Sequence, residues 1–234
     1  MAKIISSDAY LQEQKSLNKT IAFIFAFLIL LIIILMWIVN LLYGFTSIIG
    51  ACMTIGAGIL SWVFRDQAQK YIRIAICYKM GIIGEENVKN VLGLLPDTYT
   101  VIVSFHLPDN PSNIDFIVLS PFGIFTIEVK NVKGVISYDG RQLMQNNHLL
   151  EGKDILVQVR DQYWGLHAFL KEKTGKEYFI SPILVFIRPK HYIHLEPKIG
   201  EIHIIHISDL IRFIENTKSE VITNQSEIEK ALVG

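Results

Sequence analysis

Three charged residues stand inside two apolar runs that otherwise have the composition of buried β-strands. Asp115 lies in "NIDFIVLS", and Glu128 and Lys130 lie in "GIFTIEVK", with Pro121 and Phe122 between the two runs. A buried charge destabilises a fold unless it is paired or bound to a metal ion. Two carboxylates beside a lysine can serve Mg²⁺, which prefers oxygen ligands and often binds phosphate as well. The alternative is a buried ion pair that only stabilises the fold.

The length of the turn predicts which residues of the two runs face each other. If the turn is tight, Leu119 pairs with Ile124. Asp115 then lies across from Glu128, and Lys130 shares their face because strand side chains alternate. A bulge in the turn would shift this register by one residue.

The segment "GEENVKNVLGLL", residues 84–95, has helical periodicity and offers another carboxylate. Its apolar stripe consists of Val88, Val91, Leu92 and Leu95. Glu85 precedes Val88 by three residues and therefore lies on the inward face, whereas Glu86 lies nearer to solvent. We expect Glu85 to point toward the sheet.

The elements after residue 81 predict one compact α/β domain. The charged runs are preceded by the strand-like "TYTVIVSFH" and followed by a second hairpin, "GVISYDGRQLMQ", which turns at Asp139-Gly140. Next comes an amphipathic helix with the apolar stripe Ile155, Val159, Tyr163, Leu166 and Leu170. Two strands, "YFISPILVFI" and "EIHIIHI", and the helix "SDLIRFIEN" complete the chain. This order predicts a mixed β-sheet flanked by helices.

These residues resemble the NERD (nuclease-related) domain, which is grouped with the PD-(D/E)XK nuclease superfamily. The resemblance rests on Gly84-Glu85, on "NID" at 113–115, and on "GIFTIEVKN" at 123–131 with Gly134 after it. It extends from residue 81 to about residue 171. It implies a restriction-endonuclease-like core and a metal-dependent nuclease activity.

The resemblance also implies a role for individual residues. Asp115 and Glu128 would bind Mg²⁺ (or Mn²⁺), with the Val129 carbonyl as a third ligand. Lys130 would be the catalytic lysine and Glu85 the helix carboxylate. Gln158 matches a glutamine that the family carries on its second helix. The catalytic set is therefore Glu85, Asp115, Glu128, Lys130 and Gln158.

The N-terminal third of the chain has a different character. Hydrophobic residues make up 51% of the sequence and charged residues 19%, and no charged residue lies between Ile21 and Phe64. A membrane helix needs roughly 20 apolar residues, so this stretch predicts a transmembrane hairpin. Its helices would be about Thr20–Val39 and Phe45–Phe64, divided in "NLLYG". One span followed by a re-entrant segment is the alternative.

The basic residues predict the orientation of this hairpin. They flank it on both sides and are missing from its turn: Lys3, Lys15, Lys19, Arg65, Lys70, Arg73 and Lys79. Basic residues stay on the cytoplasmic side, so both termini are expected in the cytoplasm. Gly50, Thr54 and Gly58 form a stripe of small residues that serves either packing on the first span or self-association.

The expected organisation therefore has four parts. Residues 1–19 form a cytoplasmic segment, 20–64 the transmembrane hairpin in the lipid bilayer, 65–80 a juxtamembrane helix at the membrane surface, and 81–234 the NERD-like domain. The protein is expected in the cell membrane with two spans. Neither Cys52 nor Cys77 suggests a disulfide framework.

Charge and histidine content limit the functional hypotheses. Residues 81–234 contain 15 Lys and Arg against 19 Asp and Glu, whereas nucleic-acid binders usually carry a basic patch. His191, His194, His203 and His206 form two His-x-x-His pairs. On a strand these pairs point to opposite faces, which disfavours a zinc site.

Two functions are consistent with these patterns. One is a membrane-anchored, metal-dependent nuclease that acts on nucleic acid, DNA before RNA, at the cytoplasmic face. The other is a binding or scaffolding module that keeps the nuclease fold with weak or no turnover. The complete set of acids with Glu-x-Lys favours the first, and the acidic domain favours the second.

Overall fold

The computed structural model describes residues 1–6, 9–44, 48–108, 113–150, 154–188, 197–217 and 224–233. The chain divides into two compact units, one formed by Ala9–Ile82 and the other by Met1–Asp8 together with Ile83–Gly234. The second unit combines both ends of the chain. The organisation expected from the sequence sets residues 1–19 apart and does not include this connection.

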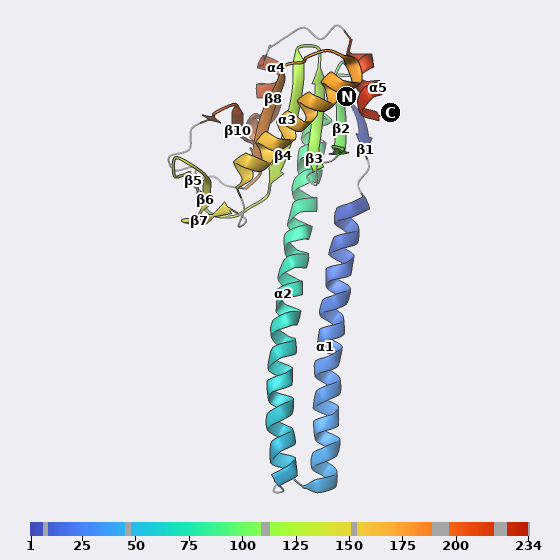
Figure 1. Cartoon of the computed structure of the whole chain (residues 1–234), viewed down its shortest axis with the longest axis vertical. Coiled ribbons are helices and arrows are strands. Elements are labelled where there is room, and N and C mark those ends of the chain that lie inside the picture. The colour runs from blue at the N-terminus through green and yellow to red at the C-terminus, as the bar shows by residue number, and fades with distance from the viewer. Residues whose placement is uncertain are drawn as a thin grey trace. The chain divides into compact units, whose positions relative to one another are not determined.

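The helical unit consists of α1 (Ala9–Tyr43) and most of α2 (Ile48–Leu92), which run side by side (Figure 1). The ring of Phe25 in α1 contacts those of Phe64 and Tyr71 in α2, with centroids 5.9 and 5.8 Å apart. Asn40 near the end of α1 donates to Thr54 near the start of α2, whereas Phe25 contacts residues further along α2, so the two helices are antiparallel.

The end of α1 agrees with the division expected in "NLLYG". Gly44 adopts φ +76°, and its N–H donates to the carbonyl of Asn40 at 3.0 Å. Such a left-handed residue commonly ends a helix, and glycine adopts it without strain. The first three residues of the expected second span, 45–47, lie outside the described residues.

One helix among the described residues is long and apolar enough to cross a membrane, Ser16–Leu42 in α1. The second span stays a prediction. The three residues of the small-residue stripe have different surroundings. Thr54 accepts a hydrogen bond from Asn40 of α1 at 3.4 Å, and Gly50 is buried. A Cβ at Gly58 would meet no atom within 4 Å.

The other unit contains a seven-stranded mixed sheet in the order β1-β2-β3-β4-β8-β10-β9. Its strands are β1 (Lys3–Ser6), β2 (Thr100–His106), β3 (Asn113–Ser120), β4 (Gly123–Lys130), β8 (Ile180–Phe186), β9 (Lys198–Ile199) and β10 (Ile202–His206). Strands β2, β3 and β4 are antiparallel, and β4, β8 and β10 are parallel. The expected α/β architecture with a mixed sheet is confirmed.

The register of the charged hairpin is also confirmed. Leu119 pairs with Ile124 and Ser120 with Gly123, so the turn is tight and no bulge shifts it. The Ser120 hydroxyl stabilises the turn by donating to the Gly123 carbonyl at 2.9 Å and accepting from the Phe122 N–H at 3.0 Å.

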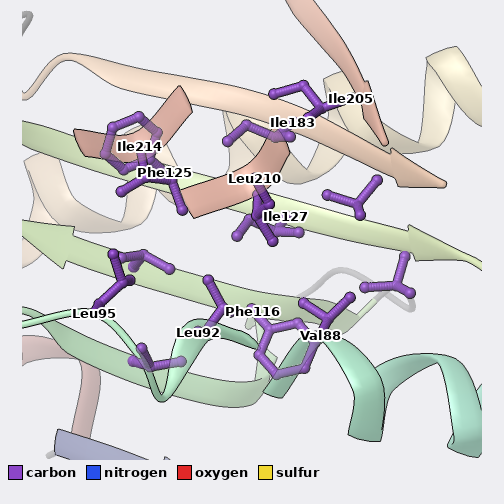
Figure 2. Close-up of a cluster of buried hydrophobic side chains, with 14 of the residues drawn as sticks. Val88, Leu92, Leu95, Phe116, Phe125, Ile127, Ile183, Ile205, Leu210 and Ile214 are labelled. Atoms are coloured by element: carbon purple, nitrogen blue, oxygen red, sulfur yellow. The ribbon is translucent and has the colours of Figure 1, made fainter. Parts of the chain in front are cut away.

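Helices cover both faces of the sheet (Figure 1). These are α3 (Ile155–Thr174), α4 (Leu210–Asn216) after the short 3₁₀ helix η2 (Ile207–Asp209), α5 (Gln225–Val233) and the end of α2. On one face, Val88 and Leu92 of α2 pack with Phe125 and Ile127 of β4 and Leu210 of α4 (Figure 2). On the other, α3 and α5 pack on β3 and β4 through a second apolar cluster.

A small second sheet interrupts the chain between β4 and α3. It consists of β5 (Ile136–Tyr138), β6 (Leu143–Gln145) and β7 (His148–Leu149). The turn at Asp139-Gly140 is confirmed: Gly140 has φ +94°, and the Asp139 carboxylate accepts from the N–H of Arg141 at 2.9 Å. The apolar side chains of the small sheet pack in one cluster with the first turns of α3 and with β8.

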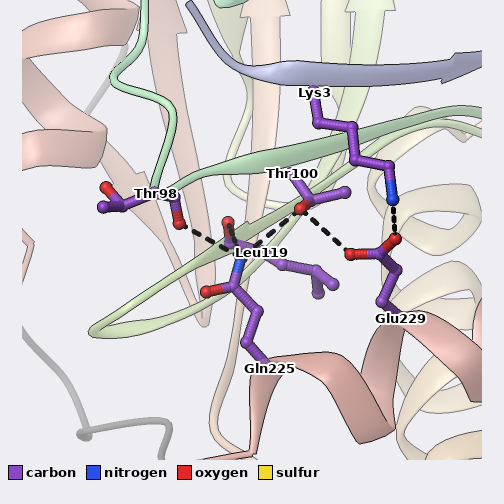
Figure 3. Close-up of polar contacts among 6 residues, drawn as sticks. All are labelled: Lys3, Thr98, Thr100, Leu119, Gln225 and Glu229. Atoms are coloured by element: carbon purple, nitrogen blue, oxygen red, sulfur yellow. Dashed lines mark hydrogen bonds and ion pairs between the residues drawn. The ribbon is translucent and has the colours of Figure 1, made fainter.

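Strand β1 attaches the N-terminus to the edge of the large sheet. It pairs in parallel with β2, and Lys3 forms an ion pair with Glu229 of α5 (Figure 3). The same Glu229 accepts from Thr100 at 3.4 Å, and Gln225 donates to the carbonyls of Thr98 at 3.2 Å and Leu119 at 3.4 Å. These contacts join β1, β2, β3 and α5.

We predict that deleting residues 2–6 destabilises the sheet. The deletion exposes the edge of β2 and removes the contact of Ala2 with the core. We expect the thermal midpoint of the detergent-solubilised chain to fall by at least about 4 °C, since 1 kcal/mol corresponds to roughly 2–4 °C at this size. Lys3→Gln is the control, because an exposed ion pair contributes at most about 1 kcal/mol. An unchanged midpoint for the deletion would show that β1 is dispensable.

Candidate active site

The candidate site is centred on the buried carboxylate of Glu128, which is 3% exposed. Its Oε1 accepts hydrogen bonds from Lys130 Nζ at 2.7 Å and from Gln158 Nε2 at 2.8 Å. Its Oε2 accepts from Gln162 Nε2 at 2.8 Å. Two strand residues and two helix residues thus meet at one carboxyl group, and its burial is compensated by three N–H donors.

Asp115 lies where the pairing of β3 with β4 ends. The last backbone pair toward this end is Phe116 with Ile127. The Asp115 carboxylate replaces the next backbone partner, since its Oδ2 accepts from the Val129 N–H at 2.8 Å. The N–H and C=O of one strand residue point to the same side, so the Val129 carbonyl also lies on the Asp115 side of β4.

Gln162 belongs to this cluster although the expected catalytic set does not include it. Its Nε2 donates to Glu128 Oε2 and also to the Asn113 carbonyl at 2.6 Å, and the residue is 1% exposed. We expected Tyr163 on the buried stripe of this helix, but Gln162 is buried and Tyr163 only partly so. The available signal was the position of Gln162, seven residues after Ile155 and four before Leu166.

Glu85 approaches the site from α2, as expected. It is half-buried, whereas Glu86 is exposed. The preceding Gly84 explains how this helix comes so close to the strand ends. A Cβ at Gly84 would lie 2.9 Å from the Asn131 Cβ and 3.1 Å from the Ile187 Cδ1, so a larger residue would displace the helix and Glu85 with it.

The negative charges around Asp115 perturb its titration. Burial raises the pKa of the Asp115 carboxyl well above its usual range, and the negative charges of Glu128 and Glu85 raise it further. The charge of Lys130 and the Val129 N–H oppose this rise. The charges of Glu85, Glu128 and Lys130 therefore all act on the Asp115 carboxyl group.

Comparison with known protein families identifies the domain that contains this site. Residues 80–187 match the family model of the nuclease-related domain, NERD. Residues 80–187 are a nuclease-related domain. The match includes α2 from Met80, the charged hairpin, the small sheet, α3 and β8. No curated protein and no solved structure gives a significant match.

The donor atoms of this nuclease-related domain suit a hard cation with few protein ligands. No group of three or more His, Cys, Asp or Glu side chains within the described residues is arranged to hold a metal ion. Mg²⁺ usually uses only one or two carboxylates and keeps several waters. Asp115 and Glu128, with the Val129 carbonyl beside them, fit that limited requirement.

Gln158 has one further feature that points to a missing donor. While its Nε2 donates to Glu128, its Oε1 is buried and has no hydrogen-bond partner in the described part of the chain. A buried acceptor without a partner is costly. A water molecule at this position would supply the donor.

His203 and His206, the described members of the two His-x-x-His pairs, have structural contacts. His203 packs on the ring of Phe213 with centroids 4.8 Å apart, and burial lowers its pKa. His206 Nδ1 accepts from the Ser208 N–H at 3.3 Å. His191 and His194 lie outside the described residues.

We predict that Asp115→Asn stabilises the metal-free nuclease-related domain at neutral pH. A raised pKa means that the folded wild type binds a proton more tightly than the unfolded chain. Its stability should therefore fall as pH rises from the ordinary aspartate pKa, about 4, through the raised value. The Asn variant lacks this loss and keeps an acceptor for the Val129 N–H. The measurement is the thermal midpoint of the full chain in EDTA between pH 4 and 8.

The matched control is Glu86→Gln, which removes an exposed acid on α2 near Glu85. It should leave the pH profile of wild type unchanged. Millimolar Mn²⁺ should raise the wild-type midpoint by linkage of binding to folding and leave that of Asp115→Asn unchanged. A lower midpoint of Asp115→Asn at pH 7 in EDTA would contradict the repulsion.

Proposed function

We propose that this protein is a membrane-anchored, metal-dependent nuclease that hydrolyses phosphodiester bonds of nucleic acid at the cytoplasmic face of the cell membrane. The observation that carries the proposal is the convergence of Asp115, Glu128 and Lys130 where the β3–β4 pairing ends, within a nuclease-related domain. DNA is the preferred substrate to test first, with RNA beside it.

The proposed roles follow from the contacts of each side chain. Lys130 is 8% exposed and its ammonium lies 2.7 Å from Glu128, so it would stabilise the negative charge that develops on the phosphoryl oxygens. The buried Oε1 of Gln158 would accept a hydrogen bond from the attacking water and orient it. Glu85 would contribute a further acidic group at the edge of the site.

Asp115, Glu128 and the Val129 carbonyl would hold Mg²⁺ or Mn²⁺. When bound, such an ion supplies Lewis-acid polarisation of the phosphoryl oxygen and neutralises developing charge. Its positive charge would also relieve the repulsion that raises the pKa of Asp115.

The membrane anchor is supported by the apolar surface of the helical unit. Large apolar side chains of α1 are exposed, among them Phe23, Trp37 and Leu41. Those of α2 include Ile55 and Trp62. Soluble proteins rarely expose an apolar surface this extensive. We infer that both helices lie in the bilayer.

Strand β1 supports an even number of spans. The chain leaves the sheet after β1, passes through α1 and α2, and returns to the same unit at Ile83. If α1 crosses the membrane, α2 must cross back. The basic residues on both sides of the pair favour the cytoplasmic side for the domain.

One observation favours the binding module as second candidate. Lys130 and Glu128 satisfy each other in a buried pair, and such pairs also occur as purely structural elements. The acidic composition of residues 81–234 points the same way, because it opposes strong nucleic-acid binding.

We predict that Lys130→Ala lowers turnover by a factor of about 10² or more, the scale for losing one group that stabilises the transition state. Metal affinity should change little, because Gln158 still donates to the same Glu128 oxygen. Glu128→Gln should remove both metal binding and activity, because its amide is a poor metal ligand. The assay is cleavage of plasmid, linear DNA and RNA by the full chain in detergent with Mg²⁺ or Mn²⁺.

Lys230→Ala, which removes an exposed lysine on α5, is the control and should retain wild-type turnover. Wild-type activity no greater than that of Lys130→Ala and Glu128→Gln on every substrate would leave the binding module as the better explanation.

We further predict that tags at the N-terminus and the C-terminus are both protected from protease added outside intact cells. The shared sheet of β1 and β2 requires the two ends to lie on one side, and the basic flanks favour the inside. Western blots before and after permeabilisation measure the protection. Digestion of the C-terminal tag alone would imply a single span and contradict the pairing of β1.

A further inference from the structure

Gln162 of α3 bridges two strands of the sheet. Its Nε2 lies 2.8 Å from Glu128 Oε2 on β4 and 2.6 Å from the Asn113 carbonyl at the start of β3. Two hydrogens on one nitrogen serve these two acceptors, so the orientation of the amide is fixed. Gln162 thus donates hydrogen bonds to both strands of the charged hairpin.

This bridge spans the point where the two strands stop pairing. Toward the open end, the backbone ladder ends at Phe116 and Ile127. Beyond it, the Asp115 carboxylate accepts a hydrogen bond from the Val129 N–H, and Gln162 donates one to the Asn113 carbonyl. The distance between the two proposed ligand residues at this end is thus set by side chains, not by the regular sheet.

Gln162 also determines which way the Glu128 carboxylate turns. Lys130 and Gln158 both donate to Oε1, whereas Gln162 donates to Oε2. Without it, the carboxyl group would be held through Oε1 alone, and the broad terminal torsion of a glutamate would leave Oε2 less well placed. A ligand that is free to rotate binds a cation less tightly, because that freedom is lost on binding.

We propose that Gln162 is the positioning residue of the acid pair. It holds β3 and β4 at the separation that Asp115 and Glu128 need for one divalent cation, and it aligns the Glu128 carboxylate. This inference rests on the proposed function. It assigns to Gln162 the role that hydrogen-bonding partners of metal ligands commonly have.

The test is Gln162→Met in the full chain, which keeps an unbranched side chain of similar length and removes both donors. We expect the affinity for Mn²⁺ alone, measured by isothermal titration calorimetry, to fall about 10-fold or more, the range for losing such a partner. At saturating Mn²⁺, kcat should fall while KM for DNA stays near that of wild type, because Gln162 is too buried to contact nucleic acid.

The matched control is Leu166→Ala, one turn further along α3. Leu166 is fully buried in the apolar cluster formed with α5, so its truncation destabilises the fold without touching Glu128. All variants are measured well below their thermal midpoints. Leu166→Ala should keep the wild-type affinity for Mn²⁺ despite its lower midpoint.

The outcomes separate the two proposals. If wild type binds Mn²⁺ and Gln162→Met binds it equally well, or if Leu166→Ala loses affinity to the same extent, the positioning role is overturned and the nuclease proposal stands. If wild type neither binds Mn²⁺ nor cleaves any substrate, the proposed function itself fails and the inference fails with it.

Discussion

A buried carboxylate must find hydrogen-bond donors, and the need of Glu128 for three of them organises this domain. Two donors, Gln158 and Gln162, come from α3, so this helix is held with that face on β4. The third, Lys130, comes from the same strand. Removal of any one of these three donors leaves a buried carboxylate oxygen less compensated. The loss in folding free energy is larger than for a hydrogen bond at the surface. The same contacts thus stabilise the packing of α3 and shape the candidate site.

The two acids of the site stand in opposite environments. Glu128 is surrounded by N–H donors, and the fold keeps its charge compensated. Asp115 has one backbone donor and two negative neighbours, Glu128 and Glu85, so its charged form is disfavoured. Such a division is typical of sites in which one group is fixed by structure and another responds to a ligand or proton. The repulsion at Asp115 is the part of the site that structural stability alone does not explain.

The predictable features were those encoded within a few residues. The tight turn fixed the register, and with it the approach of Asp115 to Glu128, because strand side chains alternate. Strand β1 was not predictable, since four residues gain their stability from β2, far along the chain. The burial of Gln162 was not predictable, because an amphipathic pattern does not indicate which polar residue beside the apolar face of α3 is buried. Helix α2 runs without interruption to Leu92, since Gly81 and Gly84 lower helix propensity without ending the helix.

The N-terminal strand connects the membrane proposal to the catalytic one. Only two residues separate β1 from α1, and α2 passes into the domain as a continuous helix. The domain is thus attached through both ends of one helical pair, and β1 belongs to the same sheet that carries Asp115 and Glu128. In that sheet only β2 lies between β1 and β3, the strand that carries Asp115. Under the proposed topology, a force on α1 would act first on the β1–β2 pairing. Under that topology, the four residues of β1 would couple the integrity of the anchor to that of the sheet.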